Sequence, residues 1–152
     1  MTSFKIITDK ESLEISGRGA VLGNIWLEIS DKAFPSDDWN DFVVIVLAWW
    51  LKEVVLLKER KSGLVHEFRF MDGPYYLRLE LDDDEQAQIE CRERTARGCQ
   101  TILAGRCRVE EIWNEVISAS KTILDIIDKR RWDTTEIQRL KDAWNLAMST
   151  AR

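Results

Sequence analysis

Residues 38–58 read DWNDFVVIVLAWWLKEVVLLK, and this stretch decides the fold. Residues 42–51 carry no polar side chain, and the apolar run resumes after the Lys52–Glu53 pair. At about 20 residues the run is too long for an ordinary strand, and at a rise of about 1.5 Å per residue a helix would cross a small domain. A helix that is apolar on almost every face has to be buried on almost every face. We therefore predict a central helix over residues 38–58.

The start of this helix is marked by polar residues. Ser36 offers an N-cap hydroxyl, and the aspartates at 37–38 would lie in the first turn, where the helix dipole favours them. A membrane span is the alternative, because about 20 apolar residues can cross a bilayer. Lys52 and Glu53 would each cost roughly 2.5 to 3.5 kcal/mol in that setting. We therefore favour a buried core helix, and we expect no signal peptide before it.

Alternation of apolar and polar residues predicts antiparallel strands on both sides of the central helix. Three-and-four spacing then predicts one amphipathic helix over residues 109–127 and a second that begins at Thr134 or Thr135. Residues 1–152 are interpreted as a single α+β domain, with an antiparallel sheet packed on one face by a long apolar central helix and two C-terminal helices. The predicted strands are residues 4–8 and 13–16 as an N-terminal hairpin, then 21–30, 64–71, 75–81, 88–92 and 99–104.

The composition argues against several classes of function. A net charge of -5 does not suit a binder of nucleic acid or of anionic membranes, which needs a basic face. The single histidine, His66, falls on the apolar face of a strand and is expected to be structural, so we predict no enzyme activity. Cys91, Cys99 and Cys107 lack the close pairs of zinc sites. They are interpreted as small buried, reduced thiols in a cytoplasmic protein, and no metal or cofactor is predicted.

Two features are candidates for binding a partner protein. The densest charge in the chain is the acidic run Asp82, Asp83, Asp84 and Glu85, which would form a solvated turn and could meet the basic residues of a partner. Trp26 falls on the polar face of its strand and is the best candidate for an exposed aromatic anchor. The other tryptophans, including Trp49 and Trp50 in the central helix, are expected to be mostly packing residues.

Two segments carry a resemblance to known proteins. Residues 34–50, FPSDDWNDFVVIVLAWW, and residues 68–81, FRFMDGPYYLRLEL, resemble a group of small bacterial proteins similar to the immunity proteins of contact-dependent inhibition and other polymorphic toxin systems. The resemblance covers residues 21–132 and implies an α+β protein that binds a cognate toxin domain. It transfers no functional residue, because immunity proteins share no diagnostic chemistry. Residues 72–75 are expected to preserve a turn.

Charge and resemblance together predict a cytoplasmic, non-enzymatic immunity protein that occludes the active site of a basic toxin domain such as a nuclease. The alternative is a small-molecule-binding protein or enzyme with a pocket between sheet and helices, walled by Tyr75, Tyr76, Arg78 or His66. A homo-oligomer with tryptophans in its interface is a third reading. The sequence leaves open the toxin, the face that binds it and the oligomeric state.

Overall fold

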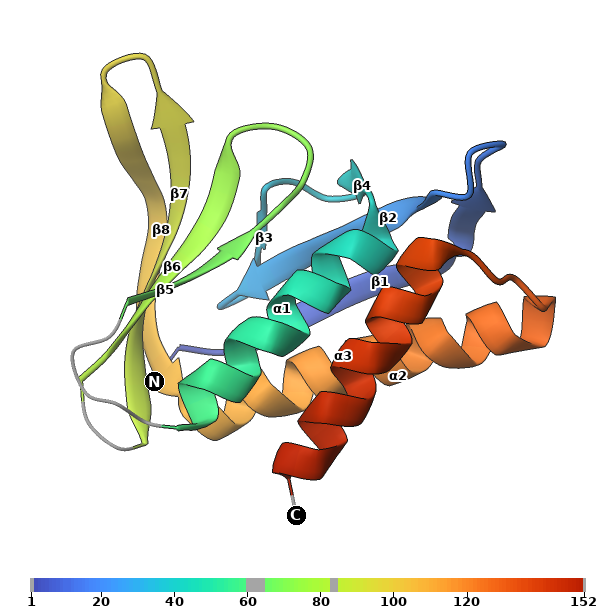
Figure 1. The fold of residues 1–152 in the computed structure, drawn as a ribbon. Helices are drawn as coiled ribbons and strands as arrows, with labels where there is room; N and C mark the ends of the chain where they lie inside the picture. Colours follow the sequence, from blue (N-terminus) through green and yellow to red (C-terminus); the bar gives the residue numbers. More distant parts are fainter. Residues whose placement is uncertain (1, 60–64, 83–84, 152) are drawn as a thin grey trace.

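The helix α1, Val43–Lys58, is the element that the rest of the chain surrounds (Figure 1). The structure is a computed structural model that describes residues 2–59, 65–82 and 85–151. α1 contacts strands of both sheets and both other helices, which confirms the prediction of a buried central helix. Among the described residues, no helix combines the length and the apolar character needed to cross a membrane. The buried side chains of α1 are Val43, Val44, Val46, Leu47, Ala48, Trp50, Leu51, Val54 and Leu57.

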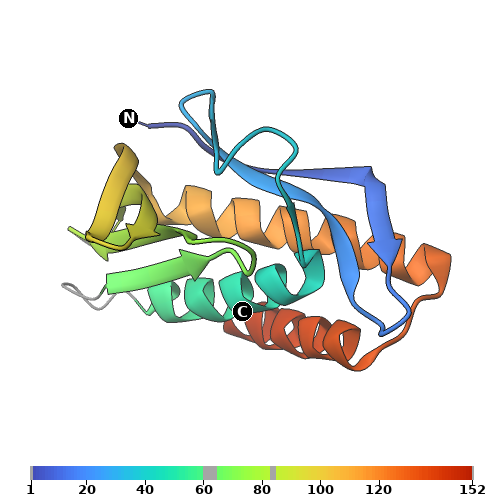
Figure 2. The same ribbon diagram turned by 90° about the horizontal axis from the view of Figure 1, so that it is seen from above.

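The described strands form two antiparallel sheets, and the α+β class is confirmed. α2 and α3 pack against α1, and α2 also lies along β1 (Figure 2). In the first sheet β2 pairs with β1, β3 and β4, whereas the second sheet follows the chain order from β5 to β8. The elements are β1 (Phe4–Ile15), β2 (Val21–Ile29), β3 (Lys32–Phe34), β4 (Asn40–Asp41), β5 (Val65–Arg69), β6 (Tyr75–Leu81), β7 (Gln86–Thr95), β8 (Gly98–Arg108), α2 (Val109–Arg130) and α3 (Thr135–Thr150).

The predicted start of the central helix is wrong. Asp38 has a left-handed backbone (φ 58°), and residues 40–41 pair with β2 before the helix begins. The N-cap is Phe42, which makes no side-chain capping hydrogen bond, and the first turn holds no acidic residue. Asp41, which precedes the N-cap, is buried and accepts hydrogen bonds from Trp39 Nε1 at 3.0 Å and from the backbone N–H of Phe42 at 2.7 Å. Residues 40–41, which the local sequence pattern assigned to the helix, therefore pair with β2 in the first sheet.

The predicted N-terminal hairpin is also wrong. β1 is one strand that pairs with β2 along its length, with a register irregularity between Asp9 and Glu14. The Ser12 hydroxyl stabilises the irregularity, because its Oγ donates to the carbonyl of Asp9 and accepts from the N–H of Asn24 at 2.8 Å. The polar residues at 9–11, which suggested a hairpin turn, lie in a bulge.

Most of the other predicted elements form, but β7 and β8 extend beyond their predicted residues and β3 was not predicted. The β5–β6 and β7–β8 hairpins form, with the turn at residues 72–74 between β5 and β6. α2 covers the predicted amphipathic segment, and Thr134 caps α3 by accepting a hydrogen bond from the N–H of Ile137. These elements were predictable because their periods and caps are local.

The two segments that carry the resemblance meet in space. Tyr75 makes edge-to-face contacts with Phe34 at 5.7 Å and with Trp39 at 5.3 Å between ring centroids. The carboxylate of Asp41 accepts a hydrogen bond from the N–H of Asp72 at 3.2 Å. Burial raises the pKa of Asp41. Hydrogen bonds from Trp39, Phe42 and Asp72 oppose that rise. Both segments therefore join the first sheet to the β5–β6 turn.

Candidate functional site

The predicted acidic surface is only partly accounted for. Asp83 and Asp84 lie outside the described residues. Asp82 follows β6, and its Oδ2 pairs with Nε of Arg106 on β8 at 2.6 Å, so an arginine of the same domain offsets its charge. Glu85 is exposed, and its backbone carbonyl accepts from the N–H of Val109, the first residue of α2.

The expectation that Trp26 is an exposed anchor is wrong. Trp26 is 8% exposed, and its indole N–H has no hydrogen-bond partner among the described residues. It lies on the opposite face of β2 from Ile25 and Leu27, as alternation predicts. Trp26 is nevertheless covered by the rest of the domain, so its place on the more polar face of the strand did not make it accessible to solvent.

The exposed tryptophan is Trp49, in the middle of α1, with 39% of its surface accessible. Ile45, Lys52 and Leu56 share its stripe of the helix, because they are spaced four, three and four residues apart. Lys52 and Leu56 are exposed as well, whereas neighbouring Trp50 is 1% exposed. A lone lysine at helical spacing from Trp49 was the sequence signal for this stripe.

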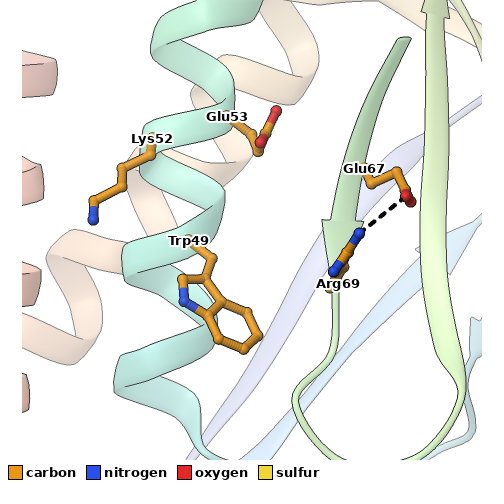
Figure 3. A pocket seen from close by; sticks show the side chains of 5 residues that line it. All are labelled: Trp49, Lys52, Glu53, Glu67 and Arg69. Atoms are coloured by element: carbon orange, nitrogen blue, oxygen red, sulfur yellow. Dashed lines mark hydrogen bonds and ion pairs between the residues drawn. The ribbon is translucent and has the colours of Figure 1, made fainter.

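Trp49 lines a cleft of about 320 Å³ between α1 and the edge strand β5, shown in Figure 3. We call this cleft the Trp49 groove. The indole and the Glu53 carboxylate point from α1 toward β5, whereas Lys52 points to the other side of the helix (Figure 3). The residues that line the groove are Trp49, Lys52, Glu53, Glu67 and Arg69.

The carboxylates of the groove are held by the domain itself. Glu53 Oε2 lies 3.1 Å from Nδ1 of His66, which is 5% exposed and hydrogen-bonded, as predicted for a core histidine. Glu67 contacts Arg69 at 3.3 Å and Arg94 of β7 at 3.0 Å. Both acidic groups are thus engaged, and the Arg69 side chain that pairs with Glu67 is 61% exposed at the rim.

A second cleft, of about 330 Å³, lies on the other side of Trp49 toward α3. Exposed Lys52 and Arg139 have no carboxylate partner within the described ranges. Glu136 in this cleft accepts from the N–H of Val21 at 2.7 Å, and burial raises its pKa. The lining residues are Ile45, Ala48, Trp49, Lys52, Met71, Glu136 and Arg139.

Much of the apolar exposure lies on α1 and β5, and two of the exposed residues, Trp49 and Met71, line these clefts. Among the described residues six large apolar side chains are exposed, and four of them lie on the outward stripe of α1 or on β5 and its following turn. Trp49 and Leu56 come from α1, and Val65 and Met71 from the second sheet. The other two are Ile102 on β8 and Leu146 on α3.

The cysteines are free thiols in two different environments. Cys91 and Cys107 are buried, and burial raises the pKa of each to about 12, so neither is a thiolate near neutral pH. Cys99 is exposed on β8, which corrects the prediction of three buried thiols, and its Sγ accepts a hydrogen bond from the Tyr76 hydroxyl at 3.0 Å. The described part of the chain contains no cluster of side chains suited to hold a metal ion.

The residues suggested for a small-molecule pocket are dispersed. His66 is buried beside Glu53, and Tyr75 belongs to the aromatic contact between the sheets. Tyr76 and Arg78 lie on the outer face of β6, where Arg94 stacks over the Tyr76 ring at 4.3 Å. Comparison with protein-family models, with curated proteins and with solved structures finds no match to this chain. The site therefore has to be interpreted from its own geometry.

Proposed function

We propose that this domain binds another protein, and that it acts in the cytoplasm as an immunity protein that covers the active site of a toxin domain. The observation that supports binding is the exposure of Trp49 together with Met71, beside a groove rimmed by charged groups. Tryptophan and methionine are enriched in protein interfaces, and clustered apolar exposure on a soluble domain is characteristic of interaction surfaces. The immunity role is supported by the resemblance of residues 34–50 and 68–81.

Charge supports the same proposal in a second way. The chain has a net charge of -5, and exposed Glu85 stands at the acidic turn between β6 and β7. An acidic protein is attracted to a basic toxin such as a nuclease, and the attraction raises the association rate before the toxin acts. The proposal assigns the acidic run at residues 82–85 to this attraction, with the charge of Asp82 partly offset by Arg106.

The test is purification of the tagged chain from the bacterium that carries its gene, at low and at high salt, followed by reconstitution with the protein recovered. We expect the C-terminal domain of an exported toxin, whose activity falls when the purified chain is added in equal amounts. Trp49→Ala should weaken this inhibition, and Ile102→Ala, which truncates an equally exposed side chain on β8, should leave it intact. Inhibition that is identical in both variants would remove the groove from the proposal.

The alternative proposal is a small-molecule binder. The Trp49 groove, at about 320 Å³, falls at the lower end of the range of known ligand pockets, and Trp49 offers a stacking face. A thermal shift with a metabolite panel would support this reading, because a ligand that binds only the folded state raises the melting temperature. If no metabolite shifts the melting temperature and a toxin domain is captured, the small-molecule alternative is rejected and protein binding remains.

A further inference from the structure

The register of β5 fixes which of its backbone groups face the Trp49 groove. The N–H of Phe70 donates to the carbonyl of Tyr75, so Phe70 is hydrogen-bonded to the neighbouring chain. In an antiparallel pair such residues alternate, so His66 and Phe68 face β6, whereas Val65, Glu67 and Arg69 direct their N–H and C=O groups away from it. The bond from Trp50 Nε1 to the carbonyl of Arg69, at 2.9 Å, agrees with this assignment.

β5 is an edge strand, and α1 covers its edge at one point. Among the described residues, Trp50 is the side chain that hydrogen-bonds to the outward backbone of β5, through the carbonyl of Arg69. The outward N–H and C=O groups of Glu67 lie beside the groove. An exposed strand edge of this kind is a template for one more strand.

The side chains around the groove select the strand that would fit. Trp49 and Met71 offer apolar surface, and cationic groups stand on both sides of the indole: Arg69 on one, Lys52 and Arg139 on the other. The nearby carboxylates of Glu53, Glu67 and Glu136 already accept hydrogen bonds or ion pairs from the domain. Arg69 is itself paired with Glu67, so among the described residues Lys52 and Arg139 are the cations of these clefts that no carboxylate engages, and they stand beside the aromatic ring.

We propose that the Trp49 groove binds an extended segment of a partner protein as an additional strand on β5. The backbone of the segment pairs with the outward N–H and C=O groups of Glu67. One of its apolar side chains sits against Trp49 and Met71, and its acidic side chains face Lys52 and Arg139. The proposal rests on the proposed protein-binding function and refines it. The partner can be basic overall while the one segment that binds in the groove carries acidic side chains.

The probe is a phage-displayed library of random linear peptides, selected against the purified full chain. We expect enriched peptides in which apolar and acidic residues alternate, with binding that weakens as salt rises because exposed charges are screened. Trp49→Ala and Lys52→Glu should each lower the affinity of the chain for a synthetic copy of the best peptide by about tenfold or more. Ile102→Ala is the matched control and should leave its affinity unchanged.

Backbone pairing is tested by Glu67→Pro against Glu67→Ala. Proline removes the outward N–H of residue 67 and leaves the bonds between β5 and β6, because a proline on an edge strand is tolerated when its missing N–H faces solvent. Alanine keeps that N–H, so only the proline variant should lose the peptide. Circular dichroism confirms that each variant is folded.

A second test of pairing leaves the protein unchanged. A peptide N-methylated at alternate residues loses the N–H groups of one edge only. One alternate pattern of methylation should abolish binding and the complementary pattern should retain it. Equal binding of both methylated peptides would overturn strand addition, as would a folded Glu67→Pro variant with unchanged affinity.

Three other outcomes are decisive. Failure to enrich any peptide over bare beads, or enrichment of basic peptides, overturns the proposal. Sedimentation of the chain as a dimer that Trp49→Ala dissociates assigns the groove to a second copy and overturns it as well. If the toxin domain is captured and inhibited but the groove variants do not affect it, the proposed function stands and strand addition on β5 is wrong.

Discussion

β1 and β5 are both edge strands with backbone N–H and C=O groups that no neighbouring strand pairs, and the two edges differ in how far other side chains bind those groups. The N–H groups of Phe4 and Ile6 on β1 donate to Glu111 and Glu115 of α2, at 3.0 and 2.8 Å. Further along β1, Arg130 donates to backbone carbonyls of Lys10 and Leu13. On β5, among the described residues, one indole bond from Trp50 reaches the outward backbone. The difference indicates that the β1 edge of the first sheet is closed against strand addition, whereas the described part of the β5 edge stays open.

The largest effect expected is the contrast between adjacent tryptophans of α1. Trp50→Ala should lower the free energy of unfolding by about 3 to 5 kcal/mol, because it opens a cavity in the core and releases the carbonyl of Arg69. Trp49→Ala should cost about 1 kcal/mol, since its ring is partly in solvent. Urea denaturation measures both. Equal losses would make Trp49 a structural residue and close the β5 edge as a site.

The next effect concerns the closed edge. Glu115→Ala should cost about 1 to 3 kcal/mol, because it leaves the half-covered N–H of Ile6 without its carboxylate. Glu110→Ala, one turn earlier and exposed, should lose only a few tenths of a kcal/mol from the helix dipole. Equilibrium unfolding of the two variants gives the comparison. If both lose the same amount, α2 does not stabilise β1 through this bond.

A smaller effect is expected in the pH dependence of stability. It concerns Glu136 of α3, a third carboxylate that hydrogen-bonds to the first sheet. Burial raises the pKa of Glu136, which accepts from the N–H of Val21, so the folded state binds its proton more tightly than the unfolded state does. The resulting stability is present below the ordinary glutamate pKa of about 4.3 and is lost as pH rises through the folded-state value.

Glu136→Gln keeps an acceptor and carries no titrating group. The unfolding free energy of this variant relative to the natural chain should therefore increase as pH rises from about 4 to 6. Chemical denaturation across that range measures the difference. A difference that falls with pH would mean that the hydrogen bond from Val21 outweighs burial and that the pKa of Glu136 is lowered.

The smallest effect is expected on β8, whose edge is closed at one place by the N-terminal segment. Thr2 donates its N–H to the carbonyl of Arg106 and accepts from the Arg106 N–H through Oγ1. A Cβ at Gly105 would collide with the Thr2 side chain, so Gly105→Ala should displace it at a cost of about 1 kcal/mol or less.

Amide hydrogen exchange at Arg106 should accelerate in this variant and make that part of β8 resemble β5. Gly17→Ala is the control, because a Cβ at Gly17 meets no neighbouring atom. Unchanged exchange at Arg106 would show that Thr2 does not protect the edge.

Local signals predicted most elements, and their failures have a common cause. The cap of α3 at Thr134 and the period of α2 depend on residues within one or two turns, and both were predicted. The helix start at Asp38 and the hairpin turn at residues 9–11 were also read from local chemistry. Both failed because β2 pairs with those segments and binds their backbone in a sheet. Pairing partners distant in sequence leave little local trace.

The candidate site shows the same limit. Alternation placed Trp26 on the polar face of β2, and the structure agrees about the face but covers it. The apolar run of α1 concealed Trp49, because only Lys52 interrupts the outward stripe. The hydrogen bonds that Glu111 and Glu115 accept from residues 107 and 109 positions away were not visible in the sequence.

The sequence by itself determined the α+β class, the buried central helix, the burial of His66 and the existence of most elements, because periodicity and capping are properties of neighbouring residues. Tertiary structure decided which tryptophan faces solvent, how Asp41 and Asp72 join the two sheets, and which strand edge remains open. Those outcomes depend on contacts between segments far apart in the chain, where burial of one group is set by the packing of another. The Trp49 groove belongs to this second kind, since β5 and α1 form it only together.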